Sequence, residues 1–93
     1  MTKKSDWLEP YLNLNVVVDL DTGHVLIGEL LEVGPDHLIF SEADLHDHTN
    51  ANSLKEVYLT EAEKHGINVN RRKVAVPRNR MLAISRLEDA KLS

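Results

Sequence analysis

The feature that most restricts the fold of this chain is a glycine in the middle of an apolar segment. Residues 24–33, HVLIGELLEV, are apolar on both sides of Gly28, and a short apolar run between two turn signals is typical of a strand. A glycine within a strand indicates a sharp bend or the close approach of another backbone segment. We therefore expect a long strand that bends at Gly28, and with it a strongly curved sheet.

The neighbouring segments complete a meander of three strands. Apolar and polar residues alternate over residues 12–20, and this period of two predicts a half-buried strand. The sequence DTG at 21–23 predicts the tight turn that leads into the glycine-containing strand. A second turn, GPD at 34–36, precedes a third predicted strand over residues 37–43.

The second half of the chain predicts a helix followed by a tightly linked pair of strands. Residues 44–53 are polar and predict a loop. Residues 53–65 predict a helix, because the segment begins with the spacing of a capping box and its apolar residues share one face. The fourth and fifth strands are expected over residues 67–77 and 81–88, joined by the short link PRNR.

Length and composition indicate one small domain, residues 1–93, with a short N-terminal helix over 5–11 and an inserted loop and helix over 45–66. The chain has no cysteine, which excludes disulfides and thiolate chemistry. No apolar run approaches the roughly 18 residues of a membrane span, and the start of the chain lacks a signal-peptide core. We therefore expect a soluble, cytoplasmic protein with no membrane association. Because a core of this size is only marginally stable alone, packing against further copies is expected.

Charge is distributed unevenly along the chain. Residues 1–63 contain 3 basic and 13 acidic side chains, whereas residues 64–87 contain 7 basic and no acidic ones. The formal net charge of −4 argues against general binding of polyanions. The segment RRKVAVPRNRM at 71–81 can still form a local basic face. This face either contacts nucleic acid, or remains solvated and pairs with acidic residues of a neighbouring subunit.

The spacing in the first two strands resembles the first signature of the Sm-like family. The matching pattern is Val16-x-Val18-x-Leu20-x-x-Gly23-x-x-x-x-Gly28-x-Leu30, and KVAVPRNRMLAIS at 73–85 occupies the place of the second signature. The resemblance covers residues 12–87. It implies a mainly β fold, a small, strongly bent, five-stranded antiparallel barrel of Sm-like or SH3-like type. The short N-terminal helix fits this fold, and the helix at 53–65 is then an insertion between the third and fourth strands.

The resemblance also implies assembly into a homo-oligomer. In Sm-like proteins the fourth strand of one subunit pairs with the fifth strand of the next, which closes a ring. An exposed edge strand must be paired, covered or blunted, so this pairing has a physical basis. The inserted helix can instead cover that edge, and a dimer therefore stays open beside the ring.

The same resemblance implies single-stranded RNA as a ligand. RNA-binding relatives hold bases near the ring pore with an Asn of the third loop and an Arg-Gly pair between the last two strands. Asp36 and His37 stand where that Asn is expected, while Arg78, Asn79 and Arg80 stand at the Arg-Gly position, without the glycine. Guanidinium groups bind phosphate and stack on bases, and an amide can read a base edge. The carboxylate of Asp36 disfavours phosphate.

A second polar constellation lies in the sequence EADLHDHTN. His46 and His48 have the His-x-His spacing seen in some transition-metal sites, but no second motif completes such a site. We expect an exposed loop without metal, and no cofactor. Because no Ser-His-Asp order, phosphate-binding loop or spaced carboxylate pair is recognisable, an enzyme is not expected. Two functions remain: an Sm-like oligomer that binds single-stranded RNA, and a non-catalytic protein-interaction or assembly module of the same fold.

Overall fold

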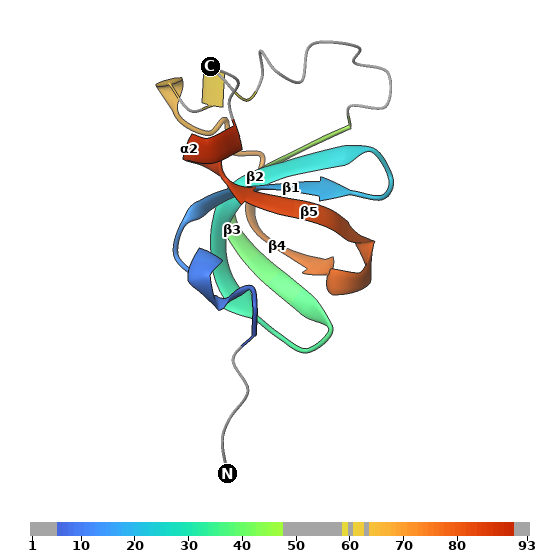
Figure 1. Ribbon diagram of the computed structural model, residues 1–93. Helices are drawn as coiled ribbons and strands as arrows, with labels where there is room; N and C mark the ends of the chain where they lie inside the picture. Colours follow the sequence, from blue (N-terminus) through green and yellow to red (C-terminus); the bar gives the residue numbers. More distant parts are fainter. Residues whose placement is uncertain (1–5, 48–58, 60, 63, 91–93) are drawn as a thin grey trace.

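Antiparallel strands form one curved five-stranded sheet, ordered β4-β3-β2-β1-β5, in the computed structural model of the protein (Figure 1). The structure describes residues 6–47, 59, 61, 62 and 64–90. The strands are β1 (Asn15–Leu20), β2 (His24–Val33), β3 (His37–Asp47), β4 (Arg71–Pro77) and β5 (Met81–Arg86). Short helical elements are the 3-10 helices η1 (Glu9–Tyr11) and η2 (Arg78–Arg80) and the helix α2 (Leu87–Ala90).

The sheet bends where β2 contains Gly28. Between Ile27 and Glu29, two residues of β3, Glu42 and Ala43, lie opposite this single glycine, which makes a β-bulge. A Cβ atom at position 28 would lie 2.9 Å from the Cβ of Ala43. Glu42 has a φ of 49°, in the left-handed region that few side chains adopt. The predicted close approach at Gly28 is therefore confirmed.

The main core fills the inside of the curved sheet, and the N-terminal segment covers one end of it. Leu8 is fully buried in this core, just ahead of η1, which carries Pro10 in its first turn. The helix expected over residues 5–11 is thus a single 3-10 turn among the described residues. The buried members of the core are Leu8, Val16, Val18, Leu26, Leu30, Leu38, Phe40, Ala43 and Val76.

A second apolar cluster lies on the outer face of the sheet. Val17, Val25 and Ile27 are buried there beneath Leu59, Ala62 and Leu87. The alternating pattern predicted a half-buried β1, and Val16 and Val18 are buried while Asn15 is exposed. Val17 is buried as well, because α2 and described residues of the segment 59–66 pack over the second face. Among the described residues of that segment, 59, 61, 62, 64 and 65 are helical. The rest of the helix expected over 53–65 lies outside the described residues, so the inserted helix stays a prediction.

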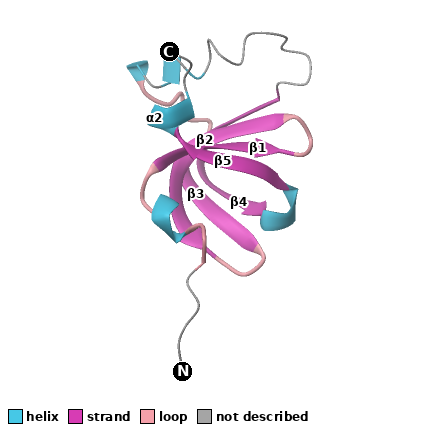
Figure 2. Ribbon diagram, viewed as in Figure 1, coloured by secondary structure: helices cyan, strands magenta, loops and turns pink. Residues whose placement is uncertain are grey.

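The expected bent barrel has its five antiparallel strands, but strand pairing does not close the sheet, and β4 and β5 are its edges. The helical turn η2 carries the chain from one edge to the other (Figure 2). Backbone hydrogen bonds tie this turn to two hairpin turns. Arg78 N–H donates to the carbonyl of Asp36 at 2.9 Å, and Asp21 N–H donates to the carbonyl of Arg80 at 2.8 Å. The edge strands β4 and β5 are thus connected by η2, which hydrogen bonds hold in place, and not by pairing with each other.

Three strand ends also differ from the prediction. β3 continues through Asp44 to Asp47, where the polar sequence predicted a loop, and β4 begins at Arg71 rather than at residue 67. The fifth strand ends at Arg86, after which α2 begins. η1 lies at one end of the curved sheet, and α2 lies at the opposite end together with the described part of the segment 59–66 (Figure 1).

Candidate nucleic-acid interface

A shallow groove lies where the turn between β2 and β3 meets the link between β4 and β5. Its lining consists of Pro35, Asp36, Pro77, Arg78 and Asn79. His37 is the register partner of Pro77 across β3 and β4, so it stands beside the same groove. The structure therefore brings together Asp36, His37, Arg78 and Asn79, four of the residues selected from the sequence.

The β2–β3 turn positions His37 beside the groove. Gly34 N–H donates to the carbonyl of His37 at 2.8 Å, which closes the turn. A Cβ on Gly34 would lie 3.1 Å from the Cε1 atom of the His37 ring. The glycine therefore leaves space for the imidazole, which is exposed to solvent together with Asp36 and Asn79.

Arg78 is held by an acidic residue far away in the sequence. Its Nη1 and Nη2 atoms donate to the Asp6 carboxylate oxygens Oδ2 and Oδ1 at 2.6 and 3.1 Å. Nη1 also donates to the carbonyl of Gly34 at 2.9 Å. The side chains of Arg78 and Asp6 are 20% and 29% exposed, so this bidentate pair lies at the surface. We call these three interactions the Asp6–Arg78 clasp.

The clasp stabilises the charged form of both partners. The hydrogen bond from Arg78, and then the one from the backbone N–H of Leu8, lowers the pKa of Asp6. The hydrogen bond to Asp6 raises the pKa of Arg78, and the nearby charge of Asp36 acts in the same direction. The guanidinium thus stays protonated at any ordinary pH.

Arg80, the fifth residue selected from the sequence, lies outside the groove lining. Its Nη1 atom is 3.2 Å from Oδ2 of Asp21 in the β1–β2 turn, and its side chain is 60% exposed. Because residues two positions apart in a 3-10 turn point in different directions, Arg78 and Arg80 reach different hairpins. The two arginines therefore do not form one cationic patch.

Sequence reasoning missed Asp6 as a partner of the groove residue Arg78. Asp6 and Arg78 are 72 positions apart, and no local pattern links them. Trp7 follows directly, with 62% of its surface exposed, whereas the next residue, Leu8, is fully buried. The one signal in the sequence was the apolar Leu8 directly after an acidic and an aromatic residue, which indicates an N-terminal segment anchored in the core.

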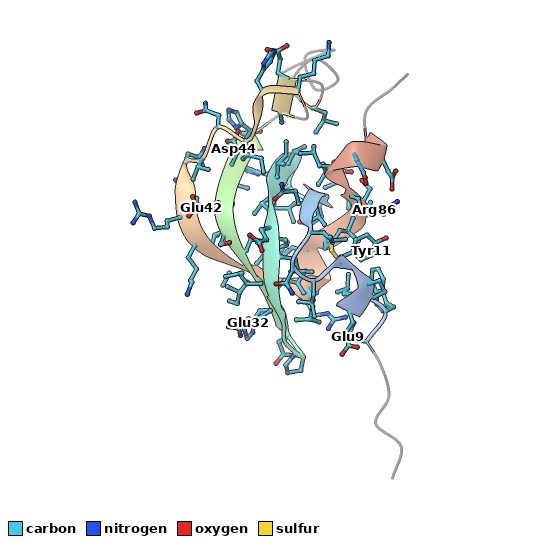
Figure 3. All side chains as sticks on the ribbon, turned by 90° about the vertical axis from the view of Figure 1, so that its left-hand side faces the viewer. Glu9, Tyr11, Glu32, Glu42, Asp44 and Arg86 are labelled. Carbon is cyan, nitrogen blue, oxygen red and sulfur yellow. The ribbon has the colours of Figure 1, made fainter. Side chains whose placement is uncertain are left out.

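The histidine constellation of the sequence is placed in a strand. His46 lies in β3 with its Nδ1 atom 2.5 Å from Oδ1 of Asp44, a carboxylate that is only 1% exposed. Asn70 Nδ2 donates to the same carboxylate oxygen at 3.0 Å. Asp44 stands towards the end of β3 nearest the segment 59–66 (Figure 3). Within the described residues, no group of three or more His, Cys, Asp or Glu side chains is arranged to hold a metal ion. His48 lies outside the described residues.

The sequence and the fold were compared with those of known proteins. No protein-family model matches the chain, and no curated protein sequence does. Among solved structures, an Sm protein from Pyrococcus abyssii in complex with a uridine heptamer superposes with a TM-score of 0.60 at 17% identity, covering 91% of this chain and 99% of that one. The fold is Sm-like.

A second solved structure also superposes on most of this chain. A chain of the NatC complex bound to CoA superposes with a TM-score of 0.55 at 16% identity, covering 88% of this chain and 86% of that chain. Identities this low show the Sm-like fold alone. In the described part of this chain, no helix has the length and apolar character to cross a membrane. The cytoplasmic location and the absence of catalysis stay predictions.

Proposed function

We propose that this protein is an Sm-like homo-oligomer that binds single-stranded RNA in the groove between the β2–β3 turn and the β4–β5 link. The observation that carries the proposal is that Arg78 and Asn79 bring a guanidinium and an amide into the groove lining, while His37 lies beside it as the register partner of Pro77. The Sm protein of similar fold, in complex with a uridine heptamer, supports the choice of ligand.

Each side chain has a role that suits an unpaired nucleotide. The exposed amide of Asn79 can hydrogen-bond to a base edge, and the exposed imidazole of His37 can stack on a base. The guanidinium of Arg78 suits a phosphate. Asp36 opposes phosphate binding, so the affinity of one groove is low. Several grooves in one assembly compensate through effective concentration.

The proposed assembly uses the two edges of the sheet. β4 and β5 each have one hydrogen-bonded neighbour, and an exposed edge of this kind favours pairing with another chain. Leu82 on β5 is 70% exposed, and Ala75 on β4 and Ala83 on β5 are exposed as well. A head-to-tail contact between β4 and β5 buries these side chains and closes into a ring if its rotation permits.

Charge complements this contact. Antiparallel pairing brings the start of β4, with exposed Arg71, Arg72 and Lys73, towards the end of β5 in the next copy. The helix α2 begins there and carries Glu88 and Asp89 in its first turn. Opposite charges therefore meet at one end of the proposed interface. Mass measurement by light scattering distinguishes this ring from a dimer or a monomer.

RNA binding is tested by titrating a fluorescent oligouridine at low salt. We expect binding that weakens as salt rises, because phosphate contacts release counterions. Asn79→Ala is expected to weaken it, since this side chain is exposed in the groove. Arg78→Ala is expected to weaken it too, and Lys64→Ala, which removes an equal charge outside the groove and outside the two edge strands, serves as the control. Arg80→Ala, which lies outside the lining, is expected to have a smaller effect than Asn79→Ala. Absence of binding to U-, A- and mixed-sequence strands at low salt contradicts the proposal.

A second candidate is a non-catalytic interaction or assembly module without RNA binding. The clasp favours it, because Arg78 already donates to Asp6 and Gly34. This candidate predicts the same oligomer in light scattering, but no oligonucleotide binding by the wild type or by variants of Asp6. A protein partner would then bind elsewhere, and Glu61 and Lys64 in the segment 59–66 are exposed for such a contact.

A further inference from the structure

The clasp has the geometry of an occupied oxyanion site. A carboxylate accepts two parallel N–H bonds from one guanidinium at 2.6 and 3.1 Å, which is the arrangement that a phosphate also adopts on arginine. We infer that the Asp6 carboxylate is the intramolecular occupant of this site and that a phosphodiester ligand takes its place, so that the N-terminal segment controls access to Arg78. The natural ligand in this inference rests on the proposed RNA binding.

Exchange at this site requires that Arg78 keep its position when Asp6 leaves. The carbonyl of Gly34 accepts a hydrogen bond from Nη1 at 2.9 Å and belongs to the β2–β3 turn, which does not depend on Asp6. The backbone of Arg78 is held by the carbonyl of Asp36 in the same turn. The guanidinium therefore stays oriented towards the groove, with Nη2 and one hydrogen of Nη1 free to receive an incoming anion.

Exchange also requires that Asp6 be displaceable but nearby. Its side chain is 29% exposed, so that a ligand from solvent can reach the pair. Leu8, two residues further on, is fully buried and anchors the segment beside the groove. Asp6 is thus tethered at a high effective concentration, and only a ligand with further contacts in the groove competes well.

The surrounding charges select between sources of phosphate. Asp36 lines the groove and its charge acts on Arg78, so an incoming anion meets a second carboxylate. The repulsion is greater for a dianion than for a monoanion. Each phosphodiester of a nucleic-acid strand carries one negative charge. Free inorganic phosphate near neutral pH is a mixture of the monoanion and the dianion, so its average negative charge is greater than one. The groove therefore favours the strand, whose bases can also contact His37 and Asn79.

The test uses the full chain and its one tryptophan, Trp7, which is adjacent to Asp6 and 62% exposed. Asp6→Asn removes the charge but retains an oxygen at the position that accepts the N–H of Leu8. Glu9→Gln is the matched control, because it removes an equal charge from the same segment. Oligouridine and inorganic phosphate are titrated separately into each protein, with binding followed by fluorescence.

We expect Asp6→Asn to bind oligouridine about tenfold more tightly than the wild type, a size typical of coupling between competing contacts. Glu9→Gln is expected to match the wild type, and adding Arg78→Lys to Asp6→Asn should abolish the gain. Inorganic phosphate should bind Asp6→Asn more weakly than the strand does.

The other outcomes separate this inference from the proposed function. Equal oligouridine affinity in the wild type, Asp6→Asn and Glu9→Gln overturns the exchange and leaves RNA binding standing. Binding of inorganic phosphate by Asp6→Asn alone, without oligouridine binding, supports the oxyanion site and contradicts the RNA function. If Asp6→Asn binds neither probe while retaining the thermal unfolding curve of a folded protein, the inference is overturned.

Discussion

At the scale of single residues, the curvature of the sheet depends on a missing side chain. A Cβ at position 28 would approach the Cβ and Cα atoms of Ala43 to 2.9 and 3.1 Å, closer than ordinary contact allows. Because the obstacle includes backbone, a flexible side chain cannot simply move aside. We expect Gly28→Ala to lower the free energy of unfolding by about 1–3 kcal/mol, measured by urea denaturation.

A paired variant checks the cause of this loss. Ala43→Gly removes the nearer of the two obstacles, so the double variant should recover part of the stability that Gly28→Ala loses. If the two substitutions are simply additive, the close approach is not the reason for the glycine.

Leu8 and Trp7 give the second prediction at this scale, because neighbours in the sequence have opposite environments. Leu8 is fully buried in the main core, whereas Trp7 is 62% exposed. We expect Leu8→Ala to cost about 2–5 kcal/mol of unfolding free energy through the cavity that it leaves. Trp7→Ala should change stability far less. Thermal unfolding followed by circular dichroism measures both, and equal losses would contradict the assigned burial.

Single residues also show how far the sequence could predict the site. The role of Gly28 was predictable because a glycine weakens a strand interior unless a bend or a close backbone contact requires it. The turn and link residues were predictable from their places between strands. The clasp was not, because ion pairing across 72 positions depends on where the chain folds back and leaves no local pattern. The separation of Arg80 from Arg78 depends on side-chain directions in a turn that the sequence did not predict.

At the scale of elements, a polar sequence gave a wrong prediction where folding brings hydrogen-bonding partners to the polar side chains. The end of β3 has the sequence of a loop, yet Asp44 is buried because His46 and Asn70 interact with its carboxylate. β1 was predicted as half-buried from its alternation, while the segments that cover its second face come from late in the chain. Turns with Gly and Pro were found correctly, since their backbone requirements are local.

The N-terminal segment as an element carries a pH prediction. Because the folded-state pKa of Asp6 is lowered, the clasp contributes fully above the unfolded value of about 3.9 and is lost as the pH falls through the lower folded value. Trp7 fluorescence should therefore stay constant down to about pH 4 and change only in more acidic solution. Asp6→Asn should lack that transition. An identical acid titration in both proteins would contradict the assignment.

At the scale of the whole molecule, both edges of the sheet are exposed and their ends differ in charge. If copies join β4 to β5, charge reversal by Arg72→Glu or Glu88→Lys should each weaken assembly, and the combination should restore part of it. Exposed ion pairs contribute about 0–1 kcal/mol each, so the expected change is a few-fold in the concentration for half assembly.

Light scattering across a dilution series at low and high salt measures this effect. Lys64→Glu, an exposed charge reversal outside the two edges, should leave the mass unchanged. If neither the charge reversals nor salt change the assembly, the contact between copies lies elsewhere.

The general fold could be predicted from the sequence because strand patterns are local. The open sheet and the hydrogen bonds that hold the link η2 could not be predicted, because they depend on how distant turns meet.

If copies assemble through β4 and β5, the link η2 has a consequence for cooperation between them. It is bonded to the β2–β3 turn through Arg78 and to the β1–β2 turn through Arg80, and it joins the two edge strands. A molecule that binds in the groove and shifts this link against the two turns would alter the angle between the edges, and with it the angle between successive copies. Ligand binding to one subunit would then change the curvature of the assembly and so affect the neighbouring subunits.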